Sequence, residues 1–305
     1  MIGDWGKFYT QHQTFLEEAY PGLSFSIFKS FLKEAYDFLG NEKISFLEKQ
    51  LLLGIPFAYI LGYADFFGRK FFVSSKVLIP RQETEILLTL GIQAIKGLSH
   101  LGLKNNFKIA EIGVGSGCLL LSLALESSFL KGKCGLTFSG IDISQEALEV
   151  AKINYYRYKR SLVFPEEEFS WHHEDRLYNC QETFDLILSN PPYLPLSWRD
   201  KKEKVHWQAS QYEPSQALFL PDDLYEEWFN SFFRQLENHL EKKSGIFLME
   251  GDPTFLPLLL NKITLLQNFQ GFLLNDLAGR CRFLVAVYSD SHPYLKEQVR
   301  QWMRY

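Results

Sequence analysis

The chain has 305 residues, enough for about two domains of ordinary size, and its 46% hydrophobic and 22% charged residues exclude disordered and fibrous proteins. The 36 acidic residues outnumber the 32 Lys and Arg, and this argues against a broad, sequence-independent grip on nucleic acid phosphates. The sequence contains no run of about 18 apolar residues, no leader-like N-terminus and no Cys-x-x-Cys pair, so we expect a cytoplasmic protein without a membrane span, zinc site or disulfide scaffold.

The first 75 or so residues have the pattern of helices. Apolar residues recur along one helical face over residues 24–39. A second helix is expected from Ser45, which has Glu48 three residues later in the spacing of a capping box. We therefore predict a small helical domain over residues 1–75.

A bridge follows this helical region. Between residues 64 and 81, aromatic and β-branched residues alternate around Gly68, which predicts a β-hairpin bridge over residues 64–83. The chain has 27 Phe residues, and several of them cluster in these two segments. We expect most of these rings, such as Phe28 and Phe71, to pack between the helical domain and the bridge.

From residue 84 onwards strand patterns alternate with helix patterns. Apolar runs predict buried strands over residues 107–112, 137–142, 184–189, 245–250 and 281–288, and helices over residues 118–127, 144–159 and 224–240. Such alternation favours an α/β fold, in which a mostly parallel sheet is covered on both faces and binds ligands at the carboxyl ends of its strands. We predict this Rossmann-like domain over residues 84–305.

A glycine-rich loop ends the first strand of this domain and opens a helix. Residues 111–117 read Glu-Ile-Gly-Val-Gly-Ser-Gly, which lets the chain turn tightly and brings backbone amides up to a ligand. The third glycine, Gly117, falls one position too early for the dinucleotide fingerprint, so NAD is disfavoured. Asp142 ends the second strand, where a carboxylate can accept hydrogen bonds from both ribose hydroxyls of a nucleoside.

The loop and this acid together resemble motifs I and II of the class I methyltransferases, which bind S-adenosylmethionine. On that resemblance Glu111 reaches the amino acid end of the cofactor, and Asp175 and Arg176 flank its adenine. The expected cofactor-binding residues are Glu111, Gly113, Val114, Gly115, Ser116, Gly117, Asp142, Asp175, Arg176 and Asn190.

The segment Asn190-Pro191-Pro192-Tyr193 follows a buried strand and is placed beside the glycine loop. Two prolines fix the backbone, so that the Asn190 side-chain oxygen and the Pro191 carbonyl can each accept one hydrogen of a planar NH₂ group. This holds the nitrogen in line with a donor methyl group, and Tyr193 can stack on the planar substrate. We predict these four residues as catalytic and substrate-binding. A metal at His172 and His173 is disfavoured because adjacent strand residues point to opposite faces.

Two substrate classes share this chemistry, namely the amino groups of nucleic acid bases and the side-chain amide of a protein glutamine. The net acidic charge and the lack of a large extra domain favour the protein substrate over DNA or RNA. Further motifs agree: residues 57–62, 66–73 and 78–85, together with the stretch from Asp276 to Arg282, resemble the release-factor glutamine methyltransferases, the PrmC/HemK family.

That resemblance implies transfer of a methyl group from S-adenosylmethionine to the amide nitrogen (N5) of the glutamine in the Gly-Gly-Gln motif of class 1 peptide chain release factors, leaving S-adenosylhomocysteine. It also implies that the helical domain recognises the substrate. Gln82 departs from the family's second proline, and Arg176 stands where the family often has an aromatic residue. A DNA or RNA amino-methyltransferase, a ribosomal-protein glutamine methyltransferase and a cofactor-binding protein without catalysis remain as alternatives.

Overall fold

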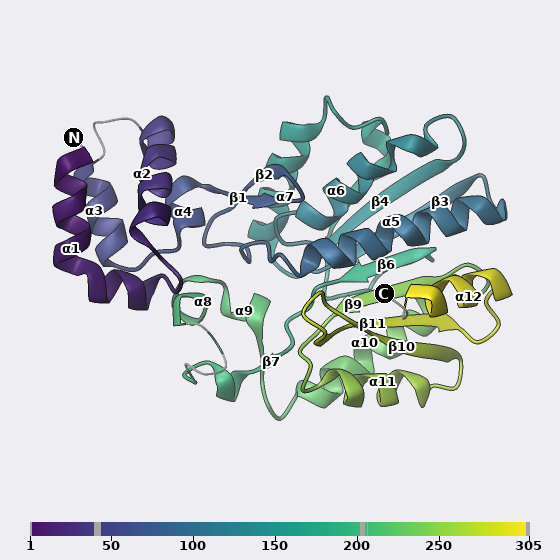
Figure 1. Cartoon of the computed structure of the whole chain (residues 1–305). Helices are drawn as coiled ribbons and strands as arrows, with labels where there is room; N and C mark the ends of the chain where they lie inside the picture. Colours follow the sequence, from purple (N-terminus) through teal and green to yellow (C-terminus); the bar gives the residue numbers. More distant parts are fainter. Residues whose placement is uncertain (1, 40–43, 202–204, 206, 303–305) are drawn as a thin grey trace.

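A computed structural model describes residues 2–39, 44–201, 205 and 207–302 of the chain. Four helices form the N-terminal region and stand apart from the sheet (Figure 1). They are α1 (Ile2–Ala19), α2 (Phe25–Leu39), α3 (Ile44–Leu52) and α4 (Phe57–Leu61). Their inward faces share a core of their own that includes Trp5, Phe28 and Leu51. The expectation that Ser45 caps a helix is wrong, because α3 begins one residue before it.

A short antiparallel hairpin follows, formed by β1 (Tyr63–Phe66) and β2 (Arg69–Phe72). Gly68 at its turn has a φ of 71°. The hairpin is shorter than predicted, since the chain from residue 73 to residue 83 forms turns and coil. Asn154 of α7 (Gln145–Tyr158) binds β2 along the backbone: its Oδ1 accepts from Phe72 N at 2.7 Å, and its Nδ2 donates to Phe72 O at 2.9 Å.

The expected packing of Phe residues between the helical region and the hairpin is wrong. Phe28 and Phe31 are buried in the helical core, whereas Phe66 and Phe71 are buried in the core of the large sheet. The hairpin therefore belongs, in its packing, to the sheet side of the molecule. The physical reason is that Asn154 of α7 forms hydrogen bonds with the backbone of β2, and the ring of Phe71 packs against Tyr158 of α7.

Seven strands form the central sheet, in the order β10-β11-β9-β6-β3-β4-β5. Their bounds are β3 (Asn106–Ile112), β4 (Gly135–Asp142), β5 (Phe169–His173), β6 (Leu186–Ser189), β9 (Ile246–Glu250), β10 (Phe269–Asn275) and β11 (Cys281–Tyr288). The strands from β9 to β5 run parallel, and β11 is antiparallel to both of its neighbours. The predicted α/β fold with a mostly parallel sheet is confirmed.

Side chains of the central strands alternate strictly between the two faces of the sheet. In β9, Ile246 and Leu248 belong to one core cluster, and Phe247 and Met249 belong to the other. This period of two is what a strand buried on both faces requires. Helices α5 (Thr84–Leu101), α6 (Cys118–Glu126), α7 and α12 (Pro293–Trp302) cover the first face, and α10 (Tyr225–His239) and α11 (Leu256–Thr264) cover the second (Figure 1).

The remaining elements are short. They are η2 (Ser127–Leu130), η3 (Glu166–Glu168), β7 (Leu194–Pro195), η4 (Leu196–Trp198), α8 (Trp207–Tyr212), α9 (Ser215–Leu218) and β8 (Phe219–Leu220). Helices α8 and α9 lie between the sheet and the N-terminal helices (Figure 1). Within the described ranges, no helix combines the length and the apolar character that crossing a bilayer demands.

Candidate active site

The glycine loop bends back on the end of β4. Gly113, Gly115 and Gly117 all adopt left-handed φ angles, of 75°, 52° and 75°. Residues with a side chain are strained in this region, so the three glycines are needed for the turn itself. Gly113 N donates to Ile141 O at 2.8 Å, which fastens the loop to β4. A Cβ atom at Gly117 would lie 3.2 Å from the Ala151 side chain of α7.

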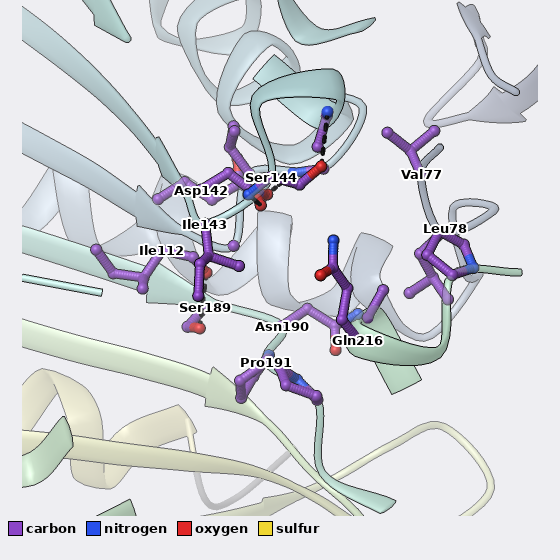
Figure 2. A pocket seen from close by; sticks show the side chains of 18 of the residues that line it. Val77, Leu78, Ile112, Asp142, Ile143, Ser144, Ser189, Asn190, Pro191 and Gln216 are labelled. Atoms are coloured by element: carbon purple, nitrogen blue, oxygen red, sulfur yellow. Dashed lines mark hydrogen bonds between the residues drawn. The ribbon is translucent and has the colours of Figure 1, made fainter. Parts of the chain in front are cut away.

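Asp142 links the loop to the start of α7. Its Oδ2 accepts from Gly115 N and its Oδ1 accepts from Ser144 N, each at 2.9 Å. Burial raises the pKa of Asp142, while these two amide hydrogen bonds act in the opposite direction. The carboxylate is thereby held still at the edge of the sheet and available to a ligand (Figure 2).

Glu111 lies deeper, below the loop. It is 3% exposed, and its Oε2 accepts from Leu120 N of α6 at 2.8 Å. Burial raises the pKa of Glu111 well above its usual range, and the nearby Asp142 adds to the effect. A buried carboxyl group on a cavity wall favours a cationic group placed opposite to it.

Asp175 and Arg176 line the cavity and pair with each other. Arg176 donates from Nε and from one terminal nitrogen to the two Asp175 oxygens, both at 2.8 Å. The guanidinium also lies over the ring of Trp228, 4.7 Å from its centroid. The ring of Trp228, on α10, therefore lines the cavity beside Arg176. Of these two residues, the sequence predicted only Arg176. Trp228 was not predicted, because nothing distinguishes it from its neighbours in an aromatic-rich amphipathic helix.

Asn190 and Pro191 follow β6 and face the loop and Asp142 across the cavity (Figure 2). Asn190 Nδ2 donates to Thr84 Oγ1, the first residue of α5, at 3.1 Å. Tyr193 is placed differently from the expectation of stacking: its side chain is packed against the second core cluster, and its hydroxyl donates to Glu250 Oε1 at 3.2 Å. Burial raises the pKa of Tyr193 well above its usual range.

These elements enclose a cavity of about 290 Å³, near the lower end of the range for small-molecule sites. All the predicted site residues line it except Gly117 and Tyr193. The structure adds a wall that the sequence did not predict. It is formed by residues 73–83, here called the linker, together with the start of α5 and the chain from α9 to β8, and it includes Val77, Leu78, Arg81, Thr84, Gln216 and Phe219.

The linker wall is held to the α8–α9 segment by a charged pair. Arg81 donates to Glu213 Oε1 at 2.7 Å, and Glu213 Oε2 accepts from Ile79 N at 2.9 Å. Glu213 is buried, so the pair fastens the two parts of this wall, the linker and the α8–α9 segment, to each other. The partners are 132 positions apart in sequence, and no local pattern links them.

The site fits a nucleoside with a cationic amino acid end. Asp142 matches ribose hydroxyls, Glu111 matches an ammonium group, and the apolar side chains of Val114 and Ile143 line the cavity between polar groups. Among the residues that the structure describes, no group of three His, Cys, Asp or Glu side chains could hold a metal ion.

Comparison with known proteins agrees with this fold. Residues 97–207 match a family model described as methyltransferase small domain. A release factor glutamine methyltransferase of Bacillus cereus is 36% identical over 195 residues, which are 63% of this chain and 62% of that protein. The chain thus spans less than two thirds of the length of this relative.

A second relative, the release factor glutamine methyltransferase of Streptococcus pneumoniae, is 32% identical over 213 residues, 69% of this chain and 67% of that protein. Among solved structures, the hMettl16 catalytic domain in complex with MAT2A 3′UTR hairpin 1 superposes with a TM-score of 0.50 at 14% identity, covering 73% of this chain and 75% of that one. At such low identity the likeness concerns the fold alone.

Proposed function

Because this chain belongs to the family of release factor glutamine methyltransferases, we propose that it methylates N5 of the glutamine in the Gly-Gly-Gln motif of class 1 peptide chain release factors. Its fold is that of the class I S-adenosylmethionine-dependent methyltransferases. The observation that carries the proposal is the cavity itself, in which Asn190 and Pro191 face Asp142 and the glycine loop (Figure 2).

The cofactor of this reaction is S-adenosylmethionine, which, when bound, supplies an electrophilic methyl group on a sulfonium. Asp142 would hold the ribose hydroxyls, and Glu111 would hold the amino acid end. Asp175, Arg176 and Trp228, which line the same cavity, would hold the adenine end.

Asn190 and the two prolines act on the substrate. A glutamine amide nitrogen is a poor nucleophile because its lone pair is delocalised into the carbonyl group. The Asn190 side-chain oxygen and the Pro191 carbonyl each accept one of its hydrogens, which orients the lone pair toward the methyl group. The nitrogen loses its extra proton to water only after transfer, so no dedicated general base is required.

The N-terminal helices and the linker serve the protein substrate in this proposal. The linker and α9 line the cavity, the N-terminal region contacts α8 through the Leu53 and Gly54 carbonyls, and the net charge of −4 disfavours a nucleic acid partner. Release factors work in translation termination, so we place the reaction in the cytoplasm. The same chemistry on a ribosomal-protein glutamine or on a nucleic acid base is an outcome of the test below.

The test is mass spectrometry of release factor incubated with the protein and S-adenosylmethionine. We expect a gain of about 14 Da, one methyl group in place of one hydrogen, on the Gly-Gly-Gln peptide. A release factor that stays unmodified, with labelled methyl appearing instead on nucleic acid or on a ribosomal protein, would contradict the proposal.

Asn190→Ala separates an enzyme from a protein that only binds the cofactor. Removal of one positioned polar group in a transition state typically costs about 100-fold or more in turnover, so we expect a loss of at least this size. Calorimetric titration with S-adenosylmethionine should still detect binding, because the loop and Asp142 are unchanged. Equal turnover of the variant and the natural protein would place the chemistry elsewhere.

A further inference from the structure

Two residues outside both the glycine loop and the Asn-Pro-Pro-Tyr segment hold the side-chain amide of Asn190. Asn190 Nδ2 donates to Thr84 Oγ1 at 3.1 Å, and Thr84 Oγ1 in turn donates to Glu250 Oε2 at 2.7 Å. Thr84 begins α5, Asn190 follows β6, and Glu250 ends β9. Thr84 is 4% exposed and Glu250 is 1% exposed, so water does not compete for these groups.

The direction of this hydrogen-bond chain follows from its buried end. An ionised carboxylate has no hydrogen to donate, and Glu250 accepts from both the Thr84 and the Tyr193 hydroxyls. Burial raises the pKa of Glu250 above its usual value, and these two donors and the Arg282 guanidinium offset only part of that rise. Since the single Thr84 hydrogen is committed to Glu250, the Thr84 oxygen is left as an acceptor.

Only the NH₂ end of the Asn190 side-chain amide can donate a hydrogen bond to the Thr84 oxygen. The NH₂ group must turn to Thr84, and the oxygen Oδ1 must then turn away from Thr84. Asn190 itself lines the cavity, so Oδ1 is the atom offered to a ligand there. If these hydrogen bonds pointed in the opposite direction, Asn190 would present its NH₂ group to the NH₂ group of a substrate amide. Two donors would then face each other.

We propose that Thr84 and Glu250 are positioning residues, which fix the Asn190 amide so that its oxygen accepts from the substrate nitrogen. The inference rests on the proposed function for the identity of that nitrogen. The alternative is a purely structural role, in which the two hydrogen bonds only fasten α5, β6 and β9 together. The two readings differ in what a variant changes, because a fastening role affects stability and cofactor binding, whereas a positioning role affects turnover.

The variants are Thr84→Val, which removes the hydroxyl at similar size, Thr84→Ser, which retains it, and Glu250→Gln, whose amide can donate to Thr84 and reverse the chain. Thr89→Val is the matched control, because Thr89 lies on the same helix and its hydroxyl donates to the Glu85 carbonyl on an exposed surface. Each full-length protein is assayed for kcat and KM with release factor, for cofactor Kd and for Tm.

We expect Thr84→Val and Glu250→Gln to lower kcat by about 100-fold, the usual cost of misplacing a reacting group by about 1 Å. Their cofactor Kd should stay within about threefold of the natural value, a change of less than about 0.7 kcal/mol. Thr84→Ser and Thr89→Val should keep full turnover. The proposal is overturned if Thr84→Ser loses as much as Thr84→Val, or if kcat is unchanged while only Tm falls.

A second measurement keeps this inference separate from the proposed function. The side-chain ¹⁵N–¹H resonances of Asn190 report the environment of its NH₂ group without any turnover. They should move in Thr84→Val and Glu250→Gln but not in Thr84→Ser; resonances that stay in place in all three would refute the positioning role. A natural protein that fails to methylate release factor would instead refute the proposed substrate and leave this result standing.

Discussion

At the scale of single residues, Asp142 is held before any ligand arrives, because backbone amides occupy both of its oxygens. Asp142→Asn replaces one acceptor with an NH₂ group that faces an amide donor. Hydrogen bonds to charged groups contribute roughly 1.5–3 kcal/mol, so we expect cofactor affinity to fall at least tenfold. Calorimetric titration measures this, with Asp65→Asn on the hairpin as a control. An affinity within twofold of the natural value would contradict the role of Asp142.

Asp142 also predicts how cofactor binding depends on pH. Burial raises the pKa of Asp142, and only its ionised form accepts from two hydroxyls. Affinity should therefore decline as the pH falls through that raised pKa, and the decline should be absent from Asp142→Asn. Titrations of both proteins across the acidic range compare the two slopes.

The buried carboxyl group of Glu111 lowers the stability of the folded protein at neutral pH, where we propose that it binds the cofactor. Because its pKa is raised in the folded protein, the folded state binds the proton more tightly than the unfolded chain does. The stabilising contribution of Glu111 is thus present below the ordinary carboxyl pKa and is lost as the pH rises through the raised value. Glu111→Gln removes the charge, and its amide oxygen can still accept from Leu120 N.

We expect the Glu111→Gln protein to be more stable at neutral pH, by on the order of 1 kcal/mol or roughly 2 °C in Tm, and to bind the cofactor more weakly. Thermal unfolding followed by circular dichroism should show this gap closing toward pH 4. A variant that unfolds at a lower temperature at neutral pH would show that the carboxylate is stabilised by its surroundings.

At the scale of elements, the glycine loop is shaped by its approach to α7. An alanine at Gly117 would meet both the left-handed φ of 75° and the Ala151 side chain at 3.2 Å. Gly102 at the end of α5 is a matched control, since it has a φ of 60° but no neighbour within 4 Å of an added Cβ. The comparison separates backbone strain from close packing.

We expect Gly102→Ala to cost about 1 kcal/mol from backbone strain and Gly117→Ala to cost a further 1–3 kcal/mol, roughly, from overpacking. Urea unfolding measures both values. Only Gly117→Ala should also weaken cofactor binding, because it moves the loop. Equal losses in the two variants would mean that α7 does not limit the loop.

At the scale of the whole molecule, the N-terminal region contacts α8 through the turn that follows α3. Gln208 of α8 donates to the Gly54 carbonyl at 2.5 Å, and the Tyr212 hydroxyl donates to that of Leu53. Leu53 is 48% exposed beside this contact, and nearby Pro214 and Gln216 line the cavity. An exposed apolar side chain beside the segment that leads into the cavity lining is suited to contact a protein substrate.

Leu53→Asp should therefore raise the KM for release factor about tenfold, because burying a charge in a protein contact is costly, while the cofactor Kd stays unchanged. Leu265→Asp, an exposed position at the end of α11, is the control and should alter neither value. Steady-state methylation at varied release factor concentration measures the effect. An unchanged KM would remove Leu53 from the substrate contact.

Residue patterns predict the fold of the large domain and most of the lining of the cavity that we propose as the cofactor site. A continuous apolar run such as residues 281–288 predicts a buried strand from its own residues. The glycines at positions 113, 115 and 117 are required by the left-handed backbone of the loop. The positions of Asp142 and Asn190 followed, because parallel strands bring their carboxyl ends to one edge. Each of these features is local in sequence. The parallel arrangement of the strands then places them at the same edge of the sheet.

The partner of each side chain, in contrast, becomes known only from the folded chain. Thr84 and Glu250 are 166 positions apart, and Asn190 and Thr84 are 106 apart, so no spacing in the sequence foretells their hydrogen bonds. The same holds for Tyr193, which donates to Glu250 and does not line the cavity. Periodicity reports which face of an element is buried, but the direction of a hydrogen bond is set by groups that meet only after the chain has folded.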